Sequence, residues 1–458
     1  MSTKNEVEVK IEPQQRREQW GSQLGFILAS AGAAVGLGNV WKFPYMTGTN
    51  GGAAFVFLYL IIILLIGASM LVVDFVVGRY GKSNAVDAYK KISSKFAWMG
   101  YLGILCAVLV LSYYAVIGGW IIHYMFNSFT TLATIAPEQV GDFFGNFISN
   151  PVSPLVPQFL FMLFTVYIVM KGIKDGIEKW NKILMPSLLV MLVILVFRSL
   201  TLEGAMAGVE FYLKPDFSKV TMATVVAACG QVFFSLNVGT TGMVVYGSYL
   251  GEDANIPKST LPIILTDTAV ALMAGLIVIP AAFAFGVEPG AGPGLVFITI
   301  PGLFSQLPFG GFFCFIFFTL LLFASITSSV SILEIVVPFF IEKFKFERIK
   351  ACIGVGIACF LLGIPVSLGF GVWSDVTIFG KTFFDLFDYF ACNISYPIIG
   401  LFGAIMVGWI WGKKNVMDQV SSNGLYTSKI NDIWFFTVKY ICPIGLIIIC
   451  LSSFGIIK

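Results

Sequence analysis

The sequence contains few charged residues. Asp, Glu, Lys and Arg together make up 12% of its 458 positions, and the formal net charge is +3. So little charge cannot cover the surface of a water-soluble protein, and the weak net charge argues against a surface that binds nucleic acid. Hydrophobic residues make up 57% of the chain and its mean hydropathy is +0.89, which indicates an integral membrane protein.

Residues that build enzyme centres are also scarce. The chain has one histidine, His123, and its eight cysteines all fall in apolar segments without the spacing of a zinc site or a redox pair. The sequence shows no nucleophile and base in a recognisable arrangement and no repeated pore motif. We therefore expect neither an enzyme nor a channel, and we interpret the cysteines as buried packing residues.

Long apolar segments are what the sequence does contain. A helix that spans a bilayer needs roughly 20 such residues, and we interpret eleven segments as spans. They predict an all-α integral membrane protein whose polar opening, residues 1–21, is a cytoplasmic tail and not a signal peptide. The predicted spans lie near residues 22–46, 53–78, 99–127, 156–171, 183–200, 220–249, 259–286, 310–341, 351–372, 383–411 and 433–456.

Basic residues predict the orientation of these spans. They gather in the N-terminal tail and in every second loop, as at residues 79–95, 171–182, 343–350 and 413–429. Because Lys and Arg are enriched in cytoplasmic loops, this pattern predicts that the N-terminus lies in the cytoplasm. The segments on the opposite side hold only Arg198, Lys214, Lys219, Lys381 and Lys458.

Three glycines interrupt the first apolar segment. Gly32, Gly36 and Gly38 each cost a helix about 1 kcal/mol relative to alanine, so they favour a break. Gly32 and Gly36 alone would also fit a GxxxG packing face. The sixth segment has a second weak point at residues 235–242. Paired interruptions at equivalent positions of two halves are typical of the binding site of a secondary transporter.

A broken helix exposes groups that bind ions. Its free carbonyl oxygens can coordinate a cation, and the free N–H groups of the next half-helix attract a carboxylate. Asp267 is the strongest side-chain candidate because a carboxylate inside a membrane is costly unless it is paired, whereas Ser and Thr often bond back to their own helix. The oxygen-bearing side chains suited to a hard cation are Asn39, Ser235, Asp267, Thr327 and Ser328.

The motifs around these residues resemble a known family. The resemblance is to the neurotransmitter:sodium symporter family, in its bacterial sodium-dependent amino-acid transporter branch and eleven-span subset. It implies a 5+5 inverted repeat with helices 1 and 6 broken: a first repeat over residues 22–200, a second over 201–412, and a cytoplasmic loop with the eleventh helix over 413–458. The matching motifs are REQWGS (17–22), GAAVGLGNVWKFP (32–44), NGG (50–52), GRYG (78–81), GQVFFS (230–235) and ASITSS (324–329).

The resemblance implies two sodium sites. The first would consist of the Ala34 carbonyl, Asn39, Ser235, Asp267 and the carboxylate of the substrate. The second would consist of the carbonyls of Gly32, Val35 and Ala324 with the hydroxyls of Thr327 and Ser328. Chloride-dependent relatives have a Ser where this chain has Ala271. We therefore expect Asp267 to supply the negative charge and transport to be independent of chloride.

The implied substrate is a neutral L-amino acid. Monoamine carriers of the family have an Asp where this chain has Gly36, so a substrate with its own carboxylate is favoured. Tyr114 and the N–H groups near Leu37 and Gly38 would hold that carboxylate. The implied pocket consists of Ala34, Leu37, Gly38, Val110, Tyr114, Phe234, Ser235, Asn237, Thr240, Ser328 and Ile332.

The resemblance also implies two gates. On the outside, Lys42 and Asp388 match an ion pair in which relatives usually have Arg in place of Lys, above a lid of Tyr114 and Phe234. Without the resemblance, such charges would be interpreted as ordinary surface pairs. The cytoplasmic gate would consist of Arg17, Trp20, Ser248, Tyr249 and Glu342.

Two further features keep more than one interpretation. Gly176 and Pro186 both disfavour helix, which predicts that the cytoplasmic half of the fifth helix can unwind and admit water to the second sodium site. Glu334 lies in the eighth apolar segment, and either a hydrogen-bonded structural carboxylate or a proton-linked site would explain it. We favour the structural interpretation.

Together, these expectations describe sodium-coupled uptake of neutral L-amino acids by alternating access across the bacterial cytoplasmic membrane. The expected partners are the amino acid, two sodium ions and the lipid bilayer, with no obligatory protein partner and no nucleic acid. A proton-coupled amino-acid carrier of the same general fold is the alternative. It would explain the broken helices, but it would not need Asn39 or the hydroxyls of Thr327 and Ser328.

Overall fold

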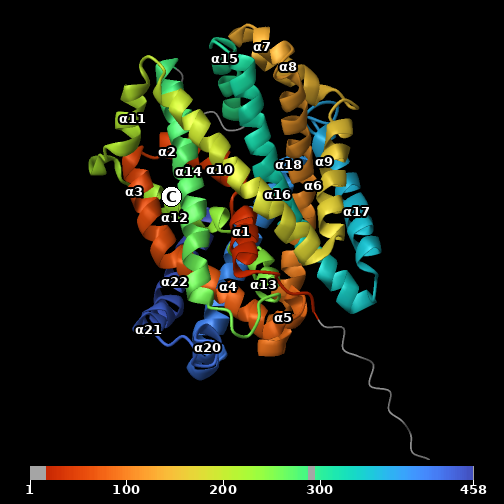
Figure 1. Ribbon diagram of the computed structural model, residues 1–458, viewed down its shortest axis with the longest axis vertical. Coiled ribbons are helices and arrows are strands. Elements are labelled where there is room, and N and C mark those ends of the chain that lie inside the picture. Colours follow the sequence, from red (N-terminus) through yellow and green to blue (C-terminus); the bar gives the residue numbers. More distant parts are fainter. Residues whose placement is uncertain (1–16, 287–293, 457–458) are drawn as a thin grey trace, which may run out of the picture.

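The computed structural model describes residues 17–286 and 294–456 of the chain. Within these ranges the regular structure is helical, and extended pairing is limited to an isolated bridge between Ile378 and Lys381. Most of the longer helices run along the long axis of the molecule (Figure 1). The predicted all-α class is confirmed. Of the predicted tail, residues 1–16 lie outside the described residues.

Within the described part of the chain, eight helical stretches are long and apolar enough to cross a membrane. Several contain a π-helical turn, which widens the helix locally without ending it. The stretches are Ala53–Gly81 (α3 Ala53–Ile62, η2 Ile63–Gly67, α4 Ala68–Gly81), Ser94–Asn127 (η3 Ser94–Phe96, α6 Ala97–Asn127), Ile173–Leu200 (η5 Ile173–Glu178, α10 Lys179–Leu200), α14 (Ile256–Ala284), α16 (Gly310–Phe344), α17 (Arg348–Leu368), Phe383–Ile410 (α18 Phe383–Asp388, η8 Tyr389–Ser395, α19 Tyr396–Ile405, η9 Met406–Ile410) and Lys429–Ser453 (α21 Lys429–Phe436, η10 Thr437–Ile441, α22 Cys442–Ser453).

The first predicted span is broken. Helix α1 (Gln23–Ala34) is followed by η1 (Gly38–Lys42) and α2 (Phe43–Thr49), and the two halves are bent by 52°. Ser22 caps the start of α1 by accepting a hydrogen bond from the Gly25 N–H at 3.0 Å. Gly36 is needed at the break because a Cβ there would lie 2.6 Å from Ser328 Oγ. The predicted break is confirmed.

The sixth predicted span is also interrupted. Helix α12 (Met222–Ser235) ends before residues 236–241, and α13 (Gly242–Gly247) follows. Asn237, Gly239 and Thr241 in the interruption have positive φ angles of 54°, 79° and 66°. Glycine is required at position 239 for two reasons. Its φ angle is positive, and a Cβ there would lie 2.2 Å from the Tyr396 carbonyl oxygen.

The number of spans stays a prediction. The bent pair around α1 adds a ninth candidate to the eight long stretches. The fourth predicted span corresponds to α9 (Leu155–Met170), and the sixth corresponds to α12 with α13. Both α9, with 16 residues, and α12, with 14, are shorter than a helix that crosses the hydrocarbon core alone.

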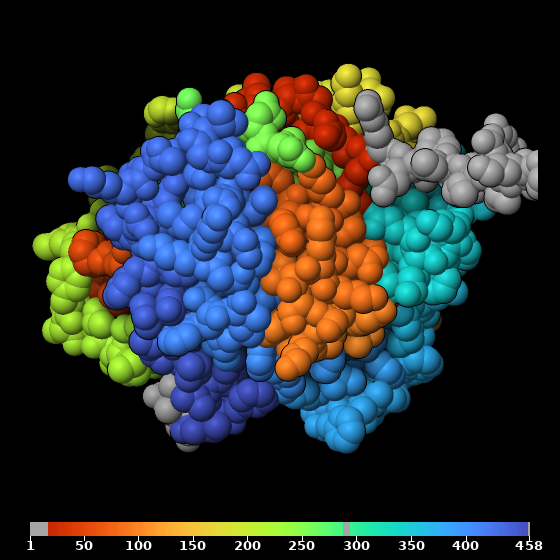
Figure 2. Space-filling model, turned by 90° about the horizontal axis from the view of Figure 1, so that it is seen from below, coloured from red at the N-terminus to blue at the C-terminus, as the bar shows by residue number. Residues whose placement is uncertain are grey.

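Shorter helices close the two ends of the molecule. Helices α5 (Ala85–Ile92) and α20 (Lys413–Val420) lie at the lower end in Figure 1, where predicted basic loops gather, and Figure 2 shows this face. At the upper end lie α7 (Thr131–Thr134), α8 (Val140–Ser149) and α15 (Ile300–Ser305). The remaining short elements are η4 (Pro137–Gln139), α11 (Ala205–Leu213), η6 (Phe217–Lys219) and η7 (Leu295–Thr299).

The centre of the bundle is formed by α6 and α16, which pack against each other. Of their most apolar segments, 78% and 72% of the residues are buried, compared with 33% in Ile173–Leu200 and 39% in Lys429–Ser453. The outer helices expose apolar side chains such as Leu64 and Val190, as a lipid-facing surface requires. The polar groups on α6 and α16 near the breaks therefore lie in a buried interior.

Candidate functional site

The break in α1 leaves backbone groups without their helical partners. The Val35 N–H still donates to the Ala31 carbonyl at 2.7 Å, but the Gly36 N–H donates to Asn39 Oδ1 at 3.1 Å. A continuous helix would have directed the Gly36 N–H to the carbonyl of Gly32. The Gly32 carbonyl thereby loses its helical donor and becomes available to a cation.

The two broken helices meet at their breaks. Asn237, in the second break, donates a hydrogen bond from Nδ2 to the Ala33 carbonyl near the end of α1. Gln231 Nε2 donates to the Gly38 carbonyl at 3.0 Å. The ring of Phe234 lies against Gly38, where a Cβ would be only 2.6 Å from a ring carbon. Glycine at position 38 thus permits close contact between η1 and α12.

Asn39, Ser235 and Asp267 form the first polar cluster. Asn39 Nδ2 lies 2.8 Å from Asp267 Oδ1 and 3.0 Å from Ser235 Oγ, and Ser235 Oγ lies 2.8 Å from Asp267 Oδ2. All three side chains are at most 1% exposed. None of the ion pairs among the described residues includes Asp267. A buried carboxylate with neutral donors only is a suitable partner for a cation.

The resemblance adds a backbone carbonyl to this cluster, and the structure adds a hydroxyl. Ala34, whose carbonyl the resemblance assigns to the first sodium site, is the last residue of α1 and is buried. Tyr59 on α3 directs its hydroxyl to Asp267 Oδ2 at 3.4 Å. Nothing in the sequence singles out Tyr59, because a tyrosine in an apolar segment is indistinguishable from an ordinary packing residue.

Thr327 and Ser328 on α16 belong to a second polar cluster. Ser328 Oγ donates to the Val35 carbonyl at 3.0 Å and lies 3.1 Å from the Ala324 carbonyl, which connects α16 to the end of α1. Thr327 Oγ1 also lies 3.0 Å from the Ala324 carbonyl. Gly32 faces Thr327, because a Cβ on Gly32 would be 3.1 Å from Thr327 Cβ. The five residues that the resemblance assigns to a second sodium site are therefore neighbours.

Tyr114 connects the break to the implied substrate pocket. Its hydroxyl accepts from the Leu37 N–H at 3.4 Å and would lie 3.1 Å from a Cβ on Gly36. Val110 precedes Tyr114 by one turn of α6, and Ile332 follows Ser328 by one turn of α16, so each pair shares a helix face. Thr240 donates from Oγ1 to the Asn237 carbonyl at 2.8 Å. The implied pocket residues thus come from the two broken helices and from α6 and α16.

The outer pair of charges is not joined. Lys42 Nζ lies over the ring of Phe234, 4.1 Å from its centroid. Asp388 instead accepts a hydrogen bond from the Tyr113 hydroxyl at 3.0 Å. The ion pairs among the described residues include none between Lys42 and Asp388. Tyr113 is therefore the hydrogen-bond partner of Asp388, and the sequence did not indicate this contact.

The residues of the implied cytoplasmic gate are in contact. Arg17 forms an ion pair with Glu342, and its Nε lies 3.0 Å from Ser248 Oγ. The guanidinium lies 4.5 Å from the ring centroid of Tyr249. Trp20 donates from Nε1 to the Tyr246 carbonyl at 3.1 Å.

Further residues at the same end make contacts that the sequence did not assign to the gate. Asn84 donates to Glu342 Oε2 from both its backbone N–H and its Nδ2, each at 2.8 Å. Glu334 accepts from the Tyr249 hydroxyl at 2.5 Å and pairs with Arg348 at 2.5 Å. Arg348 in turn lies 3.8 Å from Glu18. Glu334 is thus bound to two partners in a charge network beside the cytoplasmic gate residues.

The start of the fifth span also contacts α1. Glu178 accepts from the Gly21 N–H at 2.6 Å and from Ser22 Oγ at 2.8 Å, and it pairs with Lys182 at 2.6 Å. Gly176 lies in the π-helical turn η5, and Pro186 lies inside α10. Unwinding of this segment, which the sequence predicts, would therefore also loosen its hold on α1.

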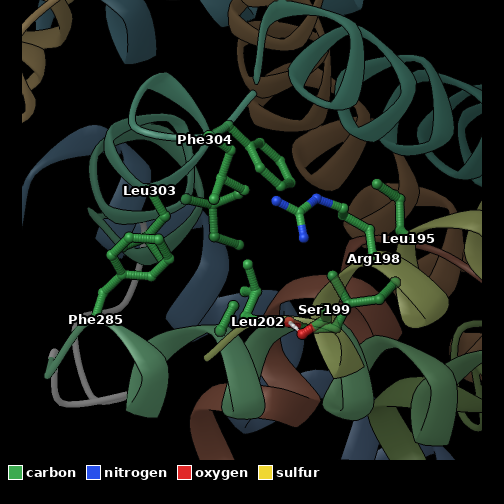
Figure 3. A pocket seen from close by; sticks show the side chains of 11 residues that line it. Leu195, Arg198, Ser199, Leu202, Phe285, Leu303 and Phe304 are labelled. Carbon is green, nitrogen blue, oxygen red and sulfur yellow. Dashed lines mark hydrogen bonds between the residues drawn. The ribbon is translucent and has the colours of Figure 1, made fainter. Parts of the chain in front are cut away.

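Two cavities bear on where the site lies. One adjoins the first break: it is bordered by Lys42, Gln231, Phe234 and Cys392. The other, shown in Figure 3, is small, with a volume of about 20 Å³, and is lined by apolar side chains together with Ser199 and the charged Arg198. It has no carboxylate in its lining and does not include the broken helices. We therefore assign neither the ion sites nor the substrate pocket to it.

Comparisons with known proteins show the family of this chain. The chain matches the sodium:neurotransmitter symporter family over residues 17–138 and 148–458. It is 40% identical over 448 residues to an uncharacterized sodium-dependent transporter of Bacillus subtilis, which covers 97% of this chain and 99% of the relative. The sodium- and chloride-dependent GABA transporter 2 of Homo sapiens is 26% identical over 485 residues, covering 93% of this chain and 79% of the relative.

A solved structure gives the same fold. The crystal structure of MhsT in complex with L-phenylalanine matches with a TM-score of 0.88 and 42% sequence identity, covering 95% of this chain and 100% of the other. Together with the family match, this likeness identifies a sodium-dependent membrane transporter and not an enzyme. The chain belongs to the sodium:neurotransmitter symporter family.

Proposed function

We propose that this transporter couples the uptake of a neutral L-amino acid to the entry of sodium through two sites. The observation that carries the proposal is the buried cluster of Asn39, Ser235 and Asp267. Its carboxylate has no cationic partner among the described residues and adjoins both broken helices. A sodium ion there would neutralise Asp267 and hold the carboxylate of an amino acid. Substrate and ion would therefore bind more tightly together than either does alone.

The second sodium site is proposed at Gly32, Val35, Ala324, Thr327 and Ser328. Its ligands would all be neutral oxygens, which suit a monovalent ion better than a divalent one. Because these groups come from α1 and α16, a bound sodium would join the two helices. Loss of the ion towards the cytoplasm would release α1 and open the inner side, which is the alternating-access step.

The substrate class follows from Gly36 and Tyr114. Gly36 has no side chain to pair with an amine, while Tyr114 and the N–H groups near Leu37 and Gly38 can bind a carboxylate. The L-phenylalanine in the complex with MhsT supports a neutral amino acid. A substrate with a charged side chain is disfavoured because Val110, Phe234 and Ile332, which border the proposed pocket, are apolar.

Chloride independence is proposed from Asp267 and Ala271. The relative in Homo sapiens is named sodium- and chloride-dependent, whereas the Bacillus subtilis relative is named sodium-dependent. Ala271 lies one turn after Asp267 on α14 and offers no hydroxyl for an anion. The fixed negative charge of Asp267 would take the place of chloride.

The proposed topology places the N-terminus, including residues 1–21, in the bacterial cytoplasm. Eleven spans would then form two inverted repeats, residues 22–200 and 201–412, followed by residues 413–458 with the last helix. The grouping of α5 and α20 at one end of the bundle supports this arrangement, because both adjoin predicted cytoplasmic loops (Figure 2).

Uptake into proteoliposomes tests the proposal. Labelled L-amino acids would be offered with an inward sodium gradient and with a matched potassium control, in chloride and in gluconate. We expect sodium-dependent accumulation of one or a few neutral amino acids, equal in both anions. Accumulation driven only by a proton gradient would favour the proton-coupled alternative, and a strict chloride requirement would contradict the role given to Asp267.

A further inference from the structure

Asn181 has a buried side-chain amide whose NH₂ group is hydrogen-bonded and whose oxygen is not, within the described part of the chain. It lies on α10 and is 1% exposed. Its Nδ2 donates to the Ile177 carbonyl at 2.9 Å, within the same helical stretch. Its Oδ1 has no hydrogen-bond partner among the residues that the structure describes. Buried amide oxygens are nearly always paired, so an unpaired one indicates a missing ligand or a missing donor.

The unpaired oxygen points at the second polar cluster. A Cβ placed on Gly32 would lie 2.1 Å from Asn181 Oδ1 and 3.1 Å from Thr327 Cβ. The oxygen therefore fills the space beside Gly32 where α1, α10 and α16 meet. Any larger residue at position 32 would displace it. Both neighbours, Gly32 through its carbonyl and Thr327 through its hydroxyl, belong to the proposed second sodium site.

We propose that Asn181 is a further residue of the second sodium site and that its amide oxygen contacts the sodium ion bound there. The inference rests on the proposed function, since it presupposes that site. An amide oxygen is a hard, neutral ligand of the kind that sodium takes, and adding one to a set without a carboxylate raises affinity without adding charge. A bound ion also gives the buried oxygen the partner that it lacks.

The position of Asn181 gives this contact a further consequence. Asn181 lies between Gly176 and Pro186, the two residues that weaken the fifth span. If that stretch unwinds, Asn181 leaves Gly32 and Thr327, and the sodium ion loses one oxygen on the side of α10. Unwinding would thus weaken sodium binding directly, in addition to admitting water.

Three variants test the contact. Asn181→Leu removes the oxygen at similar volume, and Asn181→Asp keeps an oxygen and adds charge while losing the Nδ2 donor. Gln158→Leu is the matched control. Gln158 on α9 is likewise fully buried, donates from Nε2 to the Phe360 carbonyl at 3.4 Å and has an unpaired Oε1 within the described part of the chain. Its amide lies against Gly363 of α17, where a Cβ would be 2.4 Å from Nε2.

The readout is binding of radioactive sodium to purified protein at mildly alkaline pH without amino acid. We expect Asn181→Leu to raise the half-saturating sodium concentration about tenfold, the effect of one lost oxygen contact. Asn181→Asp should lower it, because its charge attracts the ion, and Gln158→Leu should leave it unchanged. A purely structural role for the amide predicts instead that Asp and Leu both weaken binding.

The outcomes separate this inference from the proposed function. If the unaltered protein binds no sodium, the proposed function itself fails. If it binds sodium and Asn181→Leu does so equally well, only the role of Asn181 is overturned. Should Asn181→Leu not fold, the direction of the Asn181→Asp change decides, since weaker or unchanged binding in that variant contradicts a sodium contact.

Discussion

At the end of the molecule that carries α5, Arg17 is paired with Glu342 and Arg348 with Glu334, and Tyr249 contacts Arg17 and Glu334. At the opposite end, Lys42 lies on Phe234 while Asp388 accepts from Tyr113, and the two charges stay apart. A buried guanidinium and a carboxylate hold each other through parallel hydrogen bonds, whereas a cation over an aromatic ring contributes about 1 kcal/mol. In this conformation the α5 end is the more firmly closed.

The difference follows from the chemistry of the two cations. Arginine presents five donors in a fixed fork, so Arg17 and Arg348 can each satisfy several acceptors at once. Lysine is a single point charge on a flexible stem, and Lys42 finds one partner. We infer that the α5 end is held by a network and the opposite end by separate weak contacts. Four predictions test this contrast.

The largest effect is expected for Arg348→Met. This change leaves Glu334, which is fully buried, without its cation, and we expect the free energy of unfolding to fall by about 3 kcal/mol. Thermal unfolding in detergent would measure the loss. The double variant Arg348→Met with Glu334→Gln should recover most of it, because no charge then remains buried. Equal losses in the single and double variants would show that Arg348 stabilises by packing alone.

A smaller effect is expected for Arg17→Ala. Removing the Arg17 contacts to Glu342 and Ser248 should let the start of α1 open more often. We expect hydrogen exchange of residues 23–34 to rise about tenfold, which corresponds to roughly 1.4 kcal/mol. Lys42→Ala, at the other end of the same broken span, serves as the control and should leave this exchange unchanged. An equal rise in both variants would contradict a gate local to the α5 end.

Lys42→Arg should reduce the difference in stability between the two ends of the molecule. A guanidinium at this position could reach Asp388 while still lying on Phe234, so the outer side should close more firmly, by about 0.5–1 kcal/mol. We expect the turnover rate of uptake to fall roughly two- to fivefold and KM to fall with it. Lys42→Met, which cannot pair, should instead leave the outer side looser. Faster uptake in Lys42→Arg would show that this charge does not limit opening.

The smallest effect is expected at the exposed pair of Lys82 and Glu252, 2.5 Å apart. The hydrogen bond from Lys82 holds the pKa of the Glu252 carboxylate below its ordinary value. Any stabilisation is therefore fully present above the ordinary carboxylate pKa and disappears as the pH falls through the lowered one. Glu252→Gln should leave the melting temperature at neutral pH unchanged, because solvent screens this pair. A clear loss at neutral pH would mean that the pair takes part in the charge network.

Much of the fold was predictable because a membrane leaves few alternatives. Every backbone group must be satisfied inside the segment, so apolar runs had to become helices. The break around Gly32 and Gly36 was also predictable, since glycines weaken a helix wherever it lies. The spans at α9 and α12 were less well defined, because their helices are short and their ends depend on neighbouring elements.

The hydrogen-bond and ion-pair partners of individual side chains could not be predicted from the sequence. Arg348 belongs to a run of basic residues and was counted only as evidence of orientation, yet it pairs with Glu334 from the neighbouring helix. Tyr113 and Tyr59 look like packing residues in sequence but direct their hydroxyls to Asp388 and Asp267. These contacts join different helices, and the two tyrosine contacts join positions far apart in the chain, which no local pattern encodes.

Hydropathy and the effect of glycine on a helix are local properties. The amino-acid sequence alone was therefore enough to establish that the protein lies in a membrane, that it is helical and where two of its helices break. It also supplied the oxygen-bearing side chains at Asn39, Asp267 and Thr327. Which groups meet became clear only in the folded chain: Asn181 against Gly32, Glu334 with Arg348, and Lys42 with Phe234 in place of Asp388. Such pairings depend on how separate helices are packed side by side, and that packing is fixed by the whole chain at once.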